Sequence, residues 1–107
     1  MPNYVELSRR AQRDLRALTG RDRSRIVRVL RDDLVAEPPT QNLDIVALQG
    51  RTPWLRIRVG NWRVLCRPLS ADELSDAIGT AERGFLVGRI VNRRELERAV
   101  ATLPKID

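Results

Sequence analysis

The chain has 107 residues, with 20 lysines and arginines against 14 acidic residues and a net charge of +6. It contains no histidine, so the commonest general acid–base and the commonest metal ligand are both missing. Cys66 is the single cysteine, which excludes an internal disulfide and a cysteine metal cluster. These features predict one cytoplasmic domain over residues 1–107, with no cofactor, no metal and no membrane-spanning segment.

The first elements in chain order are a short strand and a helix. Residues 3–7 (NYVEL) alternate as a strand does, with successive side chains on opposite faces. Ser8 is a suitable N-cap, and apolar residues at helical spacing predict an amphipathic helix over residues 9–18. Gly20 is the expected stop of this helix, because glycine adopts the left-handed conformation that ends helices.

A second helix and a connection follow. Asp22 is expected to cap this helix, and Glu37-Pro38-Pro39 to end it. The short link between the two helices predicts an antiparallel helical hairpin. Residues 40–53 are interpreted as a connection, anchored in the core by three apolar side chains, Leu43, Val46 and Leu48.

The C-terminal half is predicted to supply most of the sheet. Strands are expected at residues 54–59, 62–67 and 85–91, and the acidic stretch 69–82 is interpreted as an exposed loop or hairpin excursion. Asn92 begins a capping-box pattern that opens a last amphipathic helix. The order β-α-α-β-β-β-α predicts an α+β fold with a mainly antiparallel sheet and the helical hairpin on one face.

The stretch WLRIRVGNWRVL has a regular pattern around Gly60-Asn61. A two-residue type II′ turn there places Arg58 opposite Arg63 and Ile57 opposite Val64. One face is then a core face, with Leu55, Ile57, Val59, Trp62, Val64 and Cys66. The other face carries Trp54, Arg56, Arg58, Arg63, Leu65 and Arg67.

This second face is strongly basic. No acidic residue occurs between Ile45 and Ala71, and like charges directly opposite each other destabilise a hairpin. An anion would relieve the repulsion, and the candidates are RNA phosphate and an acidic protein segment. A solvated basic face remains the alternative. It is also the usual interpretation of the arginines on the outer faces of the two helices, among them Arg25, although these could also help to hold RNA or an acidic partner.

The same residues carry a resemblance to a known family. LQGRTPWLRIRVGNWRVLCR resembles the central signature of the RelE/ParE toxin superfamily of type II toxin–antitoxin systems, and GRIVNRRELERAV is similar to its closing strand and basic motif. The RelE branch implies a metal-independent endoribonuclease that cuts mRNA on the ribosome and is silenced by an acidic antitoxin.

The resemblance also implies site residues. Arg56, Arg58 and Arg63 match the basic strand positions that bind the scissile phosphate, and Arg89 or Arg93 matches the basic residue at the end of the last strand. Glu97 aligns with a position that often holds tyrosine. Glu95 or Glu97 could serve as the acid or base, and a capping or surface role is the alternative for each. Further phosphate contacts are expected from four residues, Trp54, Arg51, Arg67 and Arg94.

Two other functions stay open from the sequence. The ParE branch, which poisons DNA gyrase, shares the scaffold and lacks the nuclease residues. A non-catalytic homologue would use the basic face only to bind an acidic antitoxin. Arginine in place of lysine or histidine keeps these alternatives open, because arginine stays protonated and is a poor base.

Overall fold

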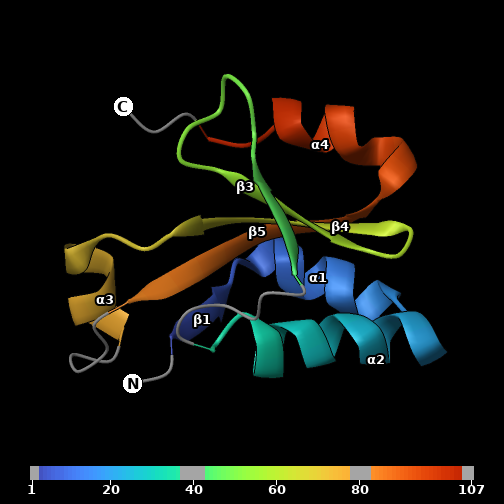
Figure 1. The fold of residues 1–107 in the computed structure, drawn as a ribbon, viewed down its shortest axis with the longest axis horizontal. Coiled ribbons are helices and arrows are strands. Elements are labelled where there is room, and N and C mark those ends of the chain that lie inside the picture. The colour runs from blue at the N-terminus through green and yellow to red at the C-terminus, as the bar shows by residue number, and fades with distance from the viewer. Residues whose placement is uncertain (1–2, 37–42, 78–82, 105–107) are drawn as a thin grey trace.

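A computed structural model describes residues 3–36, 43–77 and 83–104. Its elements follow in chain order (Figure 1): β1 Tyr4–Leu7, α1 Arg9–Ala17, α2 Gly20–Arg28, the π-helical turn η1 Val29–Asp33, β2 Asp44–Ala47, β3 Leu55–Val59, β4 Trp62–Pro68, α3 Ala71–Ala77, β5 Gly84–Asn92, the 3-10 turn η2 Arg93–Glu95 and α4 Leu96–Ala101. The predicted elements are all present, and β2 and α3 are additional.

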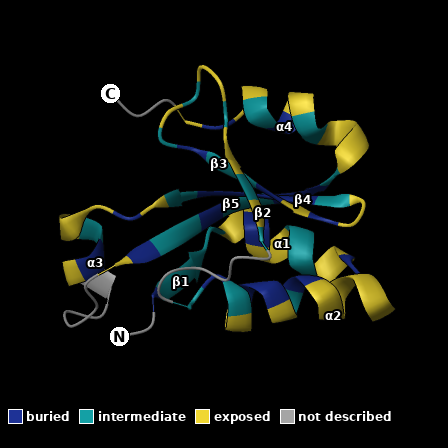
Figure 2. Ribbon diagram, viewed as in Figure 1, coloured by how far each residue is buried: buried dark blue, intermediate teal, exposed yellow. Residues whose placement is uncertain are grey.

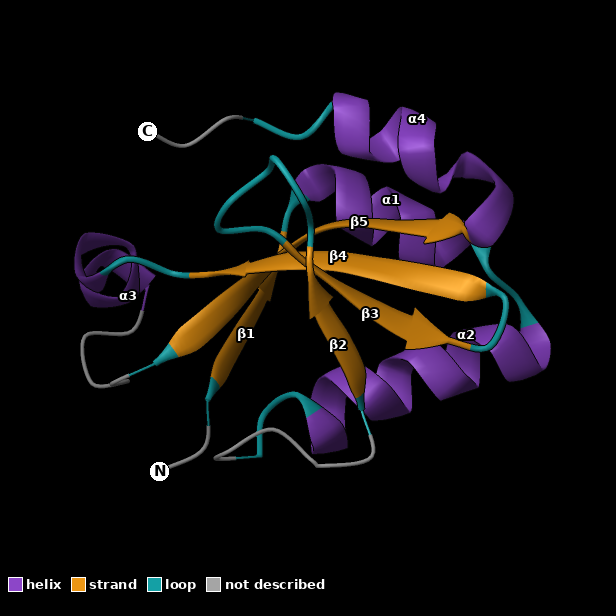
Figure 3. Cartoon of the chain, turned by 45° about the horizontal axis from the view of Figure 1, so that its top comes forward, coloured by secondary structure: helices purple, strands orange, loops and turns teal. Residues whose placement is uncertain are grey.

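The five strands form one sheet in the order β1-β5-β4-β3-β2. β1 pairs with β5 in parallel, and the other three pairings are antiparallel. Figure 3 shows the strands fanning out, with β4 in the middle. The predicted α+β class with a mainly antiparallel sheet is therefore confirmed.

Helices cover both faces of the sheet (Figure 1). α1, α2 and η1 pack on one face, where Ile26 and Leu34 join Ile57, Val64 and Val87 in the larger core cluster. α4 lies on the other face over a smaller cluster of Trp54, Leu65, Val91, Ala99 and Leu103. Figure 2 shows buried residues of β4 and β5 between the two helical layers. The predicted placement of the helical hairpin on one face is confirmed.

The start of α1 is as predicted, but the junction with α2 is not. The Ser8 hydroxyl accepts a hydrogen bond from the Ala11 amide at 3.1 Å, as an N-cap does. The helix then ends at Ala17, because Leu18 turns extended and buries its side chain in the core. Gly20, with φ 57°, begins α2 instead of ending α1, and Asp22 lies in the first turn of α2 behind the N-cap Thr19.

The end of the second helix and the connection also differ from expectation. The helical turns end at Asp33, and the expected stop at 37–39 lies outside the described residues. Part of the expected connection is the edge strand β2, and Val46 is 46% exposed there instead of anchored. Leu43 and Leu48 are packed against the two core clusters as predicted.

The acidic stretch after β4 forms a helix where a loop was expected. Ser70 caps α3, since its hydroxyl accepts from the Glu73 amide at 3.2 Å while the Glu73 carboxylate accepts from the Ser70 amide at 2.9 Å. This reciprocal pair is a capping box, and its Ser-x-x-Glu spacing is visible in the sequence. The rest of the expected excursion, residues 78–82, lies outside the described residues.

Candidate functional site

The β3–β4 hairpin has the register that the sequence predicts. Arg58 pairs with Arg63, Ile57 with Val64 and Arg56 with Leu65. Gly60 has φ 59°, and no residue other than glycine has a positive φ among the described ones, which fits a type II′ turn at Gly60-Asn61. The alternation therefore sends the side chains of Arg56, Arg58 and Arg63 away from the larger core and toward the α4 side of the sheet.

Arg63 is the fixed centre of this basic group. It is only 9% exposed, and its Nη1 donates to the carbonyls of Gly60 at 2.8 Å and Trp62 at 2.9 Å. Burial lowers the pKa of Arg63, and the nearby positive charges of Arg58, Arg56 and Arg93 lower it further. The protein thus holds a buried cation among like charges, an arrangement that a bound anion would relieve.

Arg93 joins the group through a backbone contact. Asn92 caps the turn η2 by accepting from the Arg94 amide at 3.1 Å, which confirms the predicted cap. The Arg93 amide donates to the Asn61 carbonyl at 2.8 Å, so the start of η2 is tied to the hairpin turn. We call Arg56, Arg58, Arg63 and Arg93 the arginine cluster; it combines residues from β3, β4 and η2.

One carboxylate faces the cluster, contrary to the expectation that no acid neutralises it. Asp44 of β2 lies 3.3 Å from Arg56 and pairs with Arg58 across the ladder. The sequence reasoning missed it because Asp44 immediately precedes the acid-free stretch and β2 was not predicted. Within the described part of the chain no carboxylate lies within salt-bridge distance of Arg58 or Arg63, so the cluster keeps an excess of positive charge.

Trp54 and Arg67 lie away from the cluster. Trp54 is only 2% exposed, packs under α4 and donates its indole N–H to the Pro104 carbonyl at 3.0 Å. Trp54, which the sequence places on the basic face as a phosphate contact, is therefore covered in the fold. Arg67 lies 5.8 Å from the Trp54 ring centre and makes two 2.8 Å bonds to Glu73 of α3. Its charge is thus already paired.

The Arg67–Glu73 pair gives a pH-dependent prediction. The Arg67 guanidinium and the Ser70 amide lower the pKa of Glu73 to about 2, from 4.5. Because folding lowers the pKa of Glu73, its ionised carboxylate stabilises the folded protein at pH values above 4.5, the pKa of the unfolded state. This stabilisation is lost as the pH falls through about 2. Glu73 is 38% exposed, so we expect Glu73→Gln to cost less than about 1 kcal/mol at pH 7. Thermal melts should show this difference shrinking steadily below pH 4.5; a constant difference would contradict the assignment.

Arg89 is the other predicted residue that the fold places elsewhere. Its Nε donates to Asp14 of α1 at 2.8 Å, and the same carboxylate accepts from the Ile90 amide at 2.9 Å. The β4–β5 register shifts after Leu65 and leaves Gly88 without a partner in the ladder. The resemblance left Arg89 and Arg93 open as the basic residue of the site, and only Arg93 belongs to the arginine cluster.

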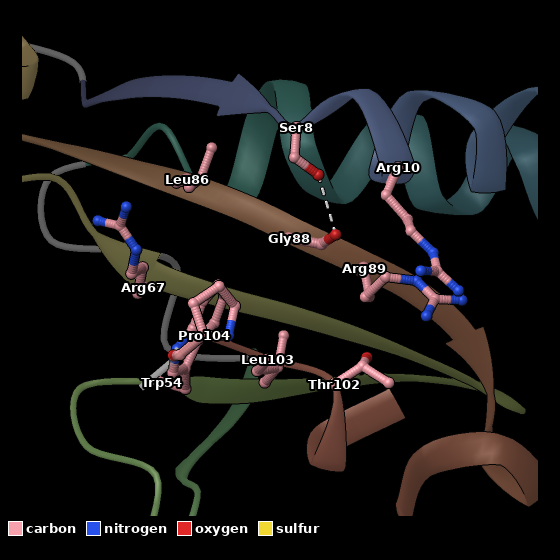
Figure 4. A pocket seen from close by; sticks show the side chains of 10 residues that line it. All are labelled: Ser8, Arg10, Trp54, Arg67, Leu86, Gly88, Arg89, Thr102, Leu103 and Pro104. Atoms are coloured by element: carbon pink, nitrogen blue, oxygen red, sulfur yellow. Dashed lines mark hydrogen bonds between the residues drawn. The ribbon is translucent and has the colours of Figure 1, made fainter. Parts of the chain in front are cut away.

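Trp54, Arg67 and Arg89 instead share a separate cavity of about 290 Å³. Figure 4 shows it between β5, the start of α1 and the segment after α4. Its wall consists of Ser8, Arg10, Trp54, Arg67, Leu86, Gly88, Arg89, Thr102, Leu103 and Pro104. Most of the predicted site residues therefore divide between the arginine cluster and this cavity.

The remaining predicted residues, Arg51, Arg94 and Glu97, make no polar side-chain contact among the described residues, and Arg51 precedes β3 at the end of that strand away from the turn. Arg94 and Glu97 are exposed, in η2 and in the first turn of α4. Arg51 lies in the β2–β3 loop, where its carbonyl accepts from the Trp54 amide at 2.8 Å. Among the described residues no hydrogen bond or salt bridge connects Glu97 to the arginine cluster.

The cluster can bind an anion and stabilise negative charge as it develops. Guanidinium groups offer paired donors to phosphate or carboxylate, and buried donors fixed in advance act most strongly on such charge. No three His, Cys, Asp or Glu residues in the described ranges lie close enough to hold a metal ion. No helix within the same ranges is long and apolar enough to span a bilayer.

Comparison with known proteins finds solved structures with a similar fold. No family model and no curated protein matches the chain. A chain of the RelB–RelE antitoxin–toxin complex from Methanococcus jannaschii is 20% identical, with a TM-score of 0.64 over 87% of this chain and 95% of that one. The chain has a RelE-like fold.

Two further structures agree. The toxin–antitoxin complex RelBE2 from Mycobacterium tuberculosis matches at 23% identity and a TM-score of 0.63, over 87% of this chain and 100% of that one. The archaeal RelE–RelB complex from Pyrococcus horikoshii matches at 21% identity and a TM-score of 0.62, over 87% of this chain and 97% of that one. The expected fold is thus confirmed, and because the ParE branch shares this scaffold, the fold does not separate the two branches. In this RelE-like fold the arginine cluster lies at the turn end of the β3–β4 hairpin.

Proposed function

We propose that the chain is the toxin of a type II toxin–antitoxin pair and cleaves mRNA on the ribosome without a metal ion. The observation that carries the proposal is the arginine cluster, in which buried Arg63 is surrounded by three further guanidinium groups. The RelE-like fold supports the same function. The sequence resemblance supports it too, because it matches Arg56, Arg58, Arg63 and Arg93 to basic positions of the RelE signature.

The proposed reaction is an internal transfer at an RNA phosphate. The ribose 2′-oxygen forms a bond to phosphorus, and the bond from phosphorus to the 5′-oxygen breaks. The 2′-hydroxyl loses its proton and the leaving 5′-oxygen gains one, which yields a 2′,3′-cyclic phosphate and a 5′-hydroxyl. Negative charge accumulates on the phosphate oxygens in between, and the cluster stabilises it.

Arginines do not supply the proton transfers, because a guanidinium stays protonated in proteins. Glu97 is the proposed acid or base, since it matches the position that often holds tyrosine in the RelE branch. It is exposed in the first turn of α4, directly after the turn that carries Arg93. A carboxylate there could act directly or through one water.

The proposed partner is an acidic antitoxin. The three similar structures are named as complexes of RelE-type proteins with RelB. This chain carries a net charge of +6, which would attract an acidic segment and speed the encounter. Antitoxin carboxylates at the arginine cluster would replace the RNA phosphate and silence the toxin.

Induction in growing cells tests the function. Wild-type protein should arrest growth, and sequencing of RNA ends should reveal new 5′-hydroxyl ends within translated mRNAs. Co-expression of an acidic protein from a neighbouring reading frame should reverse both effects. Growth arrest with intact transcripts would overturn the nuclease proposal, and a supercoiling assay would then test gyrase poisoning. Tight antitoxin binding without any toxicity would indicate a non-catalytic homologue.

A further inference from the structure

Arg25 of α2 lies against the turn of the β3–β4 hairpin. A Cβ atom placed on Gly60 would be 2.7 Å from Nη1 of Arg25 and 3.3 Å from both Cζ and Nη2. The guanidinium therefore covers the bare backbone of Gly60. It approaches from the layer of α1 and α2, whereas Arg58 and Arg63 project from the opposite face of the hairpin.

The turn does not need Arg25 to satisfy its polar groups. The Gly60 carbonyl already accepts from Arg63 at 2.8 Å, and the Asn61 carbonyl accepts from the Arg93 amide at 2.8 Å. Arg25 itself is exposed, and none of the described hydrogen bonds or salt bridges involves it. Its guanidinium donors are thus available to a ligand at the position where the hairpin has no side chain.

Glycine at position 60 serves this arrangement in two ways. Its φ of 59° is a conformation that other residues rarely adopt, and any side chain would displace the Arg25 guanidinium. The turn Gly60-Asn61 is consequently flanked by guanidinium groups on both faces, Arg25 on one and the arginine cluster on the other. Because this narrow turn has guanidinium groups on both faces, a polyanion whose backbone crosses the turn could bind one anionic group on each face.

We propose that Arg25 forms a second phosphate-binding position for single-stranded RNA. The RNA backbone crosses the Gly60-Asn61 turn, with one phosphate at the arginine cluster and another, farther along the strand, at Arg25. This inference rests on the proposed nuclease function and adds to it a contact that positions the strand. Guanidinium binds phosphate through two parallel hydrogen bonds, so the contact would also fix the direction in which the strand leaves the cluster.

Equilibrium binding of a short single-stranded RNA with 2′-O-methyl riboses tests the inference, because this RNA cannot be cleaved. Arg25→Ala is compared with Arg23→Ala, which removes an equal charge from an exposed position two residues away in α2. We expect Arg25→Ala to weaken binding about tenfold more than Arg23→Ala. The slope of log affinity against log salt concentration should fall by about 0.7 in Arg25→Ala, as for one lost single-strand phosphate.

Arg25→Lys keeps the charge and should recover part of the affinity, and thermal melts of all variants show that each is folded. Equal affinities and equal salt slopes for Arg25→Ala and Arg23→Ala, with wild-type binding intact, would overturn this inference alone. Failure of the wild-type protein to bind this RNA would also overturn the inference but would leave the nuclease function standing, because that reaction is proposed to take place on the ribosome and is tested there by sequencing of RNA ends. The two failures are therefore distinguishable.

Discussion

Arg63→Ala is expected to reduce mRNA cleavage by about 100- to 1000-fold, the usual loss when one preorganised donor to a developing anion is removed. Arg63 is the buried member of the arginine cluster, and two backbone carbonyls hold its guanidinium in place. Without Arg63, the negative charge of the transition state is stabilised mainly by Arg58 and Arg93, which are more exposed to solvent. Single-turnover cleavage of a translated mRNA on purified ribosomes measures the effect.

The same substitution should change the free energy of unfolding only slightly. Folding lowers the pKa of Arg63, so its charged form is less favourable in the folded chain than in the unfolded one. At neutral pH that charge therefore costs stability, and removing it offsets part of the loss of the two hydrogen bonds and of the side-chain packing. We expect the melting temperature of Arg63→Ala to stay close to that of the wild type. Loss of activity without loss of stability is typical of residues retained for function.

Arg98→Ala is the matched control, because Arg98 is an exposed arginine of α4 and its removal changes the net charge equally. It should leave cleavage within about threefold of wild type, a general effect of lower net charge. Full activity in folded Arg63→Ala would rule out the assigned role of the cluster. An equal loss in Arg98→Ala would show that total charge, and not the position of Arg63, determines the rate.

Trp54→Ala is expected to lower the free energy of unfolding by about 3–5 kcal/mol, the range for removing a buried tryptophan from a core. Trp54 is 2% exposed and anchors the smaller core cluster that joins α4 to the sheet. Its ring also fills the space beside Gly88, where an added Cβ would lie 2.7 Å from it. Chemical denaturation followed by far-UV circular dichroism measures the loss.

Trp54→Phe separates packing from RNA stacking. It keeps an aromatic ring but removes the indole N–H that donates to Pro104, so it should cost less than Trp54→Ala. Because Trp54 is buried, the folded Trp54→Phe protein should bind single-stranded RNA as the wild type does. A drop in RNA affinity without a drop in stability would instead support the RNA contact expected of Trp54 from the sequence and contradict its buried position.

The hairpin was predictable because its pattern is local. Residues facing each other across a two-residue turn are fixed once the turn is recognised, and the alternation of arginine with apolar residues determines which face is buried. The registers of Arg58 with Arg63 and of Leu55 with Cys66 follow from that alone. Ser8 and Asn92 were predictable for a related reason, since each caps a turn formed by the residues that directly follow it.

What could not be predicted depends on contacts between distant segments. Trp54 lies on the same face of the hairpin as the arginines, and it is buried there by α4 and the segment that follows α4, including Leu103 and Pro104. Arg89 lies on a strand whose alternation is interrupted at Gly88, and its partner Asp14 is on α1. The helix α3 is a different case, because its Ser70–Glu73 capping box was visible but was outweighed by the acidic composition of the stretch.

The parallel pairing of β1 with β5 has a consequence for the order of folding. Ser8 bonds to Gly88 across 80 residues of sequence, and Tyr4 pairs with Gly84. Contacts this far apart form late and slow the folding of a small domain. β1 therefore has no strand to pair with until β5 has been synthesised, and Arg93 reaches the hairpin only after β5 is in place. A chain still growing on the ribosome cannot hold a complete arginine cluster, so any activity that depends on all four arginines begins only once synthesis has passed β5 and η2.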